Sequence, residues 1–133
     1  MVALLIGFVA GLRTMTAPSA LWLVRGPSPT AGALAVLALA EYAVDLCPNT
    51  PARTAPAGLM GRIVSGAYCG WSVTKSTATP PVVGAGLGVA GALAGAYIGL
   101  ALRERASARL GAVPAAIAED VVAAAGALLI LRA

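Results

Sequence analysis

Apolar runs long enough to cross a membrane recur along this chain, and they constrain its fold more than any other feature. A transmembrane helix needs about 20 apolar residues to cross a hydrocarbon core of ~30 Å. Of the 133 residues, 59% are hydrophobic and 11% are charged, whereas soluble domains carry about 25% charged residues. The sequence therefore predicts an all-α integral membrane protein, with residues 1–133 forming a single transmembrane helical domain.

Proline, glycine and charged residues divide the chain into about five hydrophobic helices. The predicted helices cover residues 2–24, 31–47, 59–74, 82–102 and 114–131. The third is short for a full span, so it stays open whether segment 59–74 crosses completely. Polar loops are predicted at 48–58, 75–81 and 103–114. Because five is an odd number of spans, the two termini are expected on opposite faces of the membrane.

The first segment is interrupted by the sequence RTMTAPS at residues 13–19. An arginine is costly inside an apolar helix, and a proline removes a backbone hydrogen bond. We therefore expect the first helix to be broken near Arg13–Pro18. The hydroxyls of Thr14 and Thr16 suit a discontinuous helix whose freed backbone groups line a polar cavity.

Acidic residues also fall inside the predicted helices, where each charge costs at least ~2.5–3.5 kcal/mol on insertion scales. We predict that Arg13 pairs with Glu41, Glu119 or Asp120. Two interpretations stay open, namely a functional site and a structural lock between helices. The candidate intramembrane polar site comprises Arg13, Thr14, Thr16, Glu41, Asp45, Arg62, Glu119 and Asp120.

Glycines spaced four residues apart are typical of helices that approach each other closely in lipid. Their density here predicts tight helix packing, either within one chain or between chains of a homo-oligomer. The predicted packing glycines are Gly7, Gly11, Gly66, Gly70, Gly84, Gly88, Gly91, Gly95 and Gly99.

The basic residues give an orientation, because cytoplasmic loops of membrane proteins are enriched in lysine and arginine. With five spans, one side holds five basic residues and the other holds three, which favours a cytoplasmic N-terminus. The first group is Arg53, Arg62, Arg103, Arg105 and Arg109; the second is Arg25, Lys75 and Arg132.

Two short sequence matches raise the alternative of an inverted repeat. FVAG at 8–11 matches GVAG at 88–91, and AEYAVD at 40–45 resembles AEDVVA at 118–123. Helices one and two would then repeat as helices four and five, crossing in the opposite direction, as in many transporters. Chance similarity between sequences rich in alanine and glycine explains the matches equally well.

The composition argues against an enzyme, a metal site, a cofactor and a nucleic-acid partner. The chain has no histidine, so the commonest general base and metal ligand is missing. Cys47 and Cys69 fit no metal-binding spacing. We ascribe the net charge of +4 to basic residues in the loops that set the membrane topology. We predict no catalytic residue.

Five stretches together resemble a bacterial family of small polytopic inner-membrane proteins that is catalogued as a domain of unknown function. They are GFVAGLRTMTAPSALW (7–22), AEYAVDLCPNTPARTAP (40–56), GRIVSGAYCG (61–70), GAGLGVAGALAGAYIGLALR (84–103) and AIAEDVVAAAGALL (116–129). The chain departs from the family pattern at Leu46, where a basic residue is usual, and in the short loop RGPSPTAG. The resemblance implies the bacterial cytoplasmic membrane but no activity. The matching positions are Gly11, Leu12, Arg13, Thr14, Glu41, Asp45, Pro48, Pro51, Arg53, Thr54, Arg62, Gly66, Ala67, Glu119 and Asp120.

Two functions remain open on the sequence. The first is a small multi-pass transporter or channel that uses charged intramembrane residues, with Arg13, Glu41 and Glu119 as the working groups. The alternative is a structural or accessory membrane protein that packs through its glycine-rich helix faces. The expected partners are the lipid bilayer and either further copies of the chain or a larger membrane complex.

Overall fold

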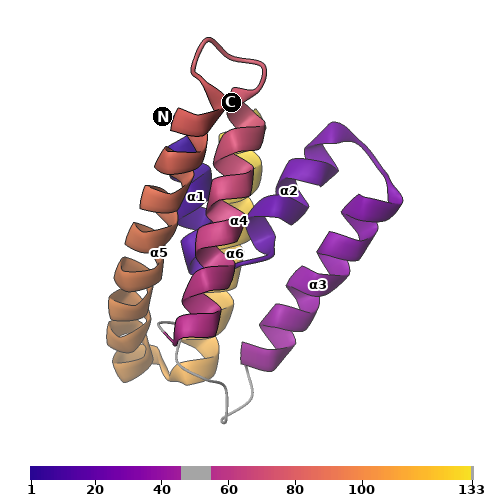
Figure 1. Ribbon diagram of the computed structural model, residues 1–133. Coiled ribbons are helices and arrows are strands. Elements are labelled where there is room, and N and C mark those ends of the chain that lie inside the picture. Colours follow the sequence, from indigo (N-terminus) through magenta and orange to yellow (C-terminus); the bar gives the residue numbers. More distant parts are fainter. Residues whose placement is uncertain (46–54, 133) are drawn as a thin grey trace.

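The computed structural model describes residues 1–45 and 55–132, which form six α-helices and no strand (Figure 1). The Pro-x-x-Pro-x-Arg-Thr positions from Pro48 to Thr54 lie outside the described residues, as do Leu46, Cys47 and the side chain of Asp45. The helices are α1 (Val2–Leu12), α2 (Thr16–Arg25), α3 (Pro29–Asp45), α4 (Pro56–Thr74), α5 (Pro81–Leu110) and α6 (Ala112–Arg132).

Proline begins three of these helices, at Pro29, Pro56 and Pro81. The first turn of a helix tolerates proline because its N–H would lack an intrahelical partner there anyway. One difference from the sequence prediction concerns 103–114, which was expected to be a loop. Helix α5 instead continues to Leu110, because Arg, Glu, Ala and Leu are strong helix formers. The chain turns at Gly111, whose φ of +89° favours glycine.

The glycines pack α1, α4 and α5 into one three-helix unit, which confirms the predicted packing role. A Cβ added at eight of them would come closer than 3.0 Å to a neighbouring helix, so no larger side chain fits without movement. The ninth, Gly99, is buried in α5. The packing therefore lies within one chain. The eight close-packed glycines are Gly7, Gly11, Gly66, Gly70, Gly84, Gly88, Gly91 and Gly95.

The order of these contacts gives the directions of the helices. Gly7 lies against Gly88, and Gly11 lies against Gly95, so α1 and α5 are parallel. A pseudo-two-fold inverted repeat would make these two helices antiparallel. The structure therefore does not contain the inverted repeat suggested by the FVAG and GVAG matches.

Helix α2 runs in the opposite direction to α1. Gly70 of α4 lies against Gly84 of α5, whereas Gly66, earlier in α4, lies against the later residue Ala92, so α4 and α5 are antiparallel. Helix α2 is parallel to α4, because Thr14, just before its start, bonds Ser65, and Trp22 in its last turn bonds the later residue Tyr68. Helix α1 is parallel to α5, and α2 is parallel to α4. Because α4 and α5 are antiparallel, the chain reverses direction between α1 and α2.

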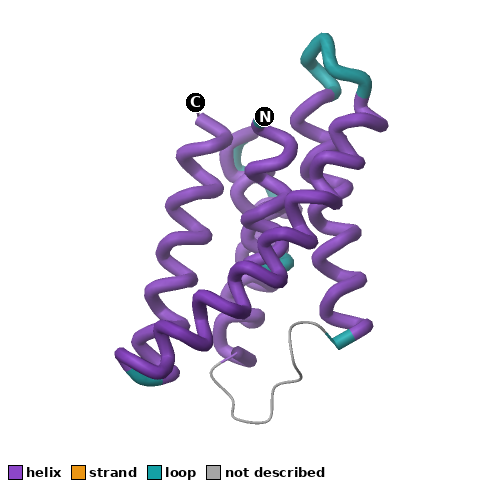
Figure 2. The backbone as a smooth tube through the Cα atoms, turned by 90° about the vertical axis from the view of Figure 1, so that its left-hand side faces the viewer, coloured by secondary structure: helices purple, strands orange, loops and turns teal. Residues whose placement is uncertain are grey.

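Segment 2–24 therefore forms a helical hairpin, not the single broken span expected from the sequence. Both termini consequently lie at the same end of the bundle, as Figure 1 and Figure 2 show. The four helices α3 to α6 then run the length of the bundle in alternating directions. We call the end near the termini the upper end, and the end where α3 and α5 finish the lower end. The sequence missed the reversal because a helix break carries no information about the angle between its two halves.

Helix α3 is the least embedded part of the bundle. It packs on α2, and Figure 1 shows it standing apart from α4 and α5.

Two of the described helices, α5 and α6, are long and apolar enough to cross a membrane. Helix α1 and residues Pro29–Val44 of α3 are apolar but shorter.

Candidate functional site

The tip of the α1–α2 hairpin brings the predicted polar residues together. Helix α1 ends at Leu12, Arg13 is extended with φ −143° and ψ 118°, and α2 begins at Thr16. The C-terminal carbonyls of one short helix and the N-terminal amides of the other therefore meet in the same place. Such helix ends leave backbone groups without intrahelical partners. Charged side chains from three other helices meet them.

Glu41 of α3 binds the N-terminal end of α2. Its Oε1 accepts the backbone N–H of Thr14, and its Oε2 accepts the backbone N–H of Met15, each at 2.8 Å. A carboxylate is favourable at this end because the helix dipole places partial positive charge there. Glu41 thus acts as a cap supplied from another helix.

Arg62 and Ser65 of α4 bind the other side of the tip. Nη1 of Arg62 donates to the carbonyl oxygen of Gly11 at 3.0 Å, where the dipole of α1 is negative. Oγ of Ser65 donates to the carbonyl oxygen of Thr14 at 2.6 Å. Arg62 is buried. Each end of the broken helix therefore meets a side chain of complementary charge.

Arg13 is the largest fully buried side chain among the described residues, at 0% exposure. Its Nη2 forms a salt bridge with Oδ1 of Asp120 in α6. Its guanidinium carbon also lies 5.2 Å from the ring centroid of Tyr42, within the range of a cation–π contact. The prediction that Arg13 pairs with an acidic residue of another helix is confirmed, with Asp120 as the partner.

Glu119 points away from this cluster. Adjacent residues on a helix project about 100° apart, and one carboxylate oxygen of Glu119 lies 3.7 Å from Nη1 of Arg103 in α5. The structure thus places Arg13, Thr14, Thr16, Glu41, Arg62 and Asp120 together, and places Glu119 at the α5–α6 side.

Two tyrosines and a tryptophan join the site without having been predicted from the sequence. The Tyr42 hydroxyl lies 2.6 Å from Oγ1 of Thr16, and the indole N–H of Trp22 donates to the Tyr68 hydroxyl at 2.9 Å. The available signal was weak, because an aromatic residue next to Glu41 is as typical of a lipid-facing helix as of a site.

The cluster has no net formal charge, because Arg13 and Arg62 balance Glu41 and Asp120. It lies nearer to the lower end of the bundle. At ~1.5 Å per residue, Glu41 is about 6 Å before the end of α3 and Asp120 about 12 Å after the start of α6. The polar groups therefore form a layer roughly two-fifths of the way along α6.

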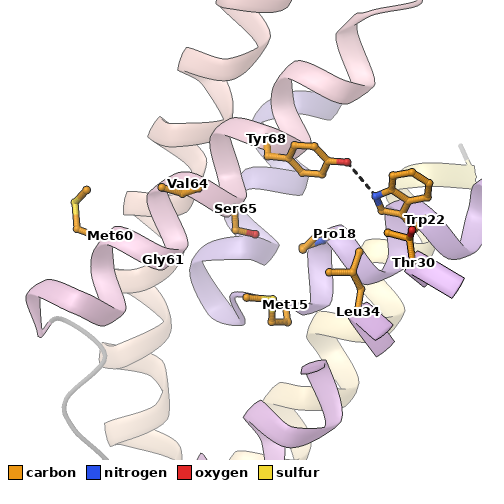
Figure 3. A pocket seen from close by; sticks show the side chains of 10 residues that line it. All are labelled: Met15, Pro18, Trp22, Thr30, Leu34, Met60, Gly61, Val64, Ser65 and Tyr68. Carbon is orange, nitrogen blue, oxygen red and sulfur yellow. Dashed lines mark hydrogen bonds between the residues drawn. The ribbon is translucent and has the colours of Figure 1, made fainter. Parts of the chain in front are cut away.

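A groove between α3 and α4 reaches the hairpin tip (Figure 3). Its upper part has a volume of about 560 Å³ and is lined mainly by apolar side chains of α2, α3 and α4. The hydrogen-bonded Trp22 and Tyr68 lie together on its wall (Figure 3). Its lower part, about 380 Å³, shares Met15 and Gly61 with the upper part and is bordered by Thr14 and Glu41.

The described residues contain no group of three histidine, cysteine or acidic side chains that could hold a metal ion. Comparisons with protein-family models, with curated proteins and with solved structures find no match for this chain. The function is therefore inferred from the geometry of the site.

Proposed function

We propose that this chain is a multi-pass membrane protein that moves a small ion, as a transporter or a channel, past the tip of its re-entrant α1–α2 hairpin. The observation that carries this proposal is the meeting of two oppositely directed half-helix ends, each bound by a complementary charge. Half-helices of this kind build ion and substrate sites in many transporters.

The membrane location is supported by the distribution of apolar side chains. The buried core is dominated by alanine and glycine, and it encloses Arg13 and Arg62. Large aliphatic residues face outward instead, with Val82 80% exposed and Leu129 70% exposed. A soluble protein of this size rarely exposes so much contiguous apolar surface, whereas lipid solvates it favourably.

Aromatic and basic residues at the upper end support the same location. Lys75 Nζ lies 3.6 Å from the Trp71 ring centroid, and the guanidinium carbon of Arg25 lies 5.6 Å from that of Trp22. Both pairs occur where α2 and α4 end. Tryptophan and basic residues are enriched at membrane–water interfaces, so these pairs mark the upper boundary of the membrane.

The hairpin changes the proposed orientation. Arg25, Lys75 and Arg132 lie at the upper end, which also holds the N-terminus. Arg103, Arg105 and Arg109 belong to the lower part of α5. Arg53 lies between α3 and α4 in the sequence, and we count it with the lower end. The count is then four basic residues for the lower end and three for the upper end, so the lower end is cytoplasmic by the positive-inside rule. Both termini are then non-cytoplasmic.

The ion-transport proposal is tested in proteoliposomes that contain a pH-sensitive dye, with a membrane potential set by a potassium gradient and valinomycin. We expect proton flux above that of protein-free liposomes. The double variant Arg13→Ala with Asp120→Asn, which leaves no unpaired buried charge, should abolish the flux in protein that stays monodisperse. Glu104→Gln is the matched control, because Glu104 is an exposed acid of α5 that the site does not use.

A structural role is the second candidate, and the neutral, internally paired cluster favours it. Two of the four charges bind backbone groups of the hairpin tip and the other two pair with each other, so together they fix the positions of α1, α2, α3, α4 and α6 without any transported species. Wild-type protein that passes neither protons, potassium nor chloride faster than empty liposomes would support this role and refute transport.

A further inference from the structure

A second hollow lies on the other side of α3 from the groove, between α2, α3 and α6. Its volume is about 230 Å³, which is room for several water molecules. Its walls are mostly small or aliphatic, with Ala38, Ala124 and Leu128 among them. Three hydroxyl groups line it as well, from Thr16, Ser19 and Tyr42.

Ser19 is the unusual member of this lining. It is 5% exposed, and its Oγ has no hydrogen-bond partner among the described residues. A buried hydroxyl without a partner is destabilising, and native proteins normally satisfy such a group with protein or with ordered water. The unsatisfied Oγ of Ser19 borders a space large enough to hold the missing partner.

The two other hydroxyls can hold water at the same place. The oxygens of Thr16 and Tyr42 lie 2.6 Å apart, and one hydrogen is enough to make that bond. The second hydroxyl hydrogen is then available to a further acceptor. A water molecule needs two to four polar partners, and these three hydroxyls supply that number.

The hollow lies close to the Arg13–Asp120 pair. Asp120, Ala124 and Leu128 are spaced four residues apart and share one face of α6, and the last two line the hollow. Tyr42 lines the hollow as well, and the guanidinium carbon of Arg13 lies 5.2 Å from its ring centroid. Water in the hollow would therefore lie next to the buried ion pair.

We infer that the cavity between α2, α3 and α6 is a water-binding site at membrane depth, in which Ser19, Thr16 and Tyr42 hold water beside the Arg13–Asp120 pair. This inference rests on the proposed membrane location but not on transport. It assigns Ser19 a role as a water ligand that the sequence did not suggest.

Cysteine accessibility in intact membranes tests the inference. The parent protein carries Cys47→Ser and keeps Cys69, whose 0% exposure makes it the unreactive background. The probe is a membrane-impermeant, positively charged methanethiosulfonate. Because the thiolate is the reactive form and forms in water, we expect Ser19→Cys to react at least about ten-fold faster than Ala127→Cys, a buried α6 position away from the cavity.

Two further positions make the outcome unambiguous. Ala38→Cys enters the same cavity from α3 and should react like Ser19→Cys, which keeps the test valid where the change at Ser19 prevents folding. Ala125→Cys lies on the exposed face of α6 and should be unreactive because it faces lipid. Unreactive cysteines at both cavity positions overturn the water site while leaving transport untouched. Rapid reaction of Ala125→Cys refutes the membrane location itself.

Discussion

Removing Arg13 should destabilise the protein more than removing Arg13 and Asp120 together. Arg13 is fully buried, and its salt-bridge partner Asp120 has a side chain that is 17% exposed. Loss of one member of a buried pair leaves the other charge uncompensated and typically costs about 3–5 kcal/mol. We therefore expect Arg13→Ala to lower the free energy of unfolding by about 3–5 kcal/mol.

The double variant Arg13→Ala with Asp120→Asn removes the uncompensated charge. Residues that share a buried pair show interaction energies of about 0.5–3 kcal/mol in double-mutant cycles, and the full burial of Arg13 places this pair at the upper end of that range. The double variant should therefore recover about 2–3 kcal/mol relative to additivity. Part of the loss remains, because the arginine side chain also fills space beside Tyr42.

Reversible unfolding in mixed micelles with increasing denaturing detergent measures the four free energies of this cycle. A matched cycle of Arg13→Ala with Glu119→Gln serves as the control, because Glu119 pairs with Arg103. It should be additive within about 0.5 kcal/mol. Equal coupling in both cycles, or additivity in the Asp120 cycle, would refute the assignment of Asp120 as the specific partner of Arg13.

Three other predictions follow from the packing and the hydrogen bonds. Gly95→Leu should prevent folding because its side chain would meet the backbone of α1, whereas Gly86→Leu on the same helix meets nothing within 4 Å and should give a normal yield on size-exclusion chromatography. Glu41→Ala should lower stability by about 1–3 kcal/mol through two unpaired amides of α2, and an unchanged unfolding midpoint would contradict the capping role. Tags fused to the two termini should be accessible from the same face of the membrane, and labelling from opposite faces would restore the five-span topology.

The chemistry of the hairpin tip could be predicted from the sequence, but its geometry could not. Arg13 and Pro18 indicated a break in the first helix, because neither residue suits the interior of an apolar helix. In the structure Pro18 lies in the first turn of α2 and the break falls at Arg13–Met15, so the interruption was predicted to within a few residues. The reversal of direction depends on which neighbours each half-helix packs against, and those contacts join residues far apart in sequence.

Glycine spacing likewise predicted a close-packed face but not its partner. The same pattern would serve a dimer of identical helices, and only the contacts of Gly7 with Gly88 and of Gly70 with Gly84 show that the packing is intramolecular. Ser19 gave no signal at all, because a serine in an apolar segment is common and its missing partner is a property of the folded chain.

The parallel packing of α1 on α5 has a consequence for biosynthesis. Helix α1 has 11 residues, which is too short to be stable alone or to cross a bilayer. The helix that holds it ends at Leu110, about 100 residues later in the chain. At ~5–20 residues per second, α1 waits about 5–20 s for this partner to be synthesised. The hairpin is thus synthesised well before the helix that holds it, and during that interval it is open to capture by an insertase or a protease.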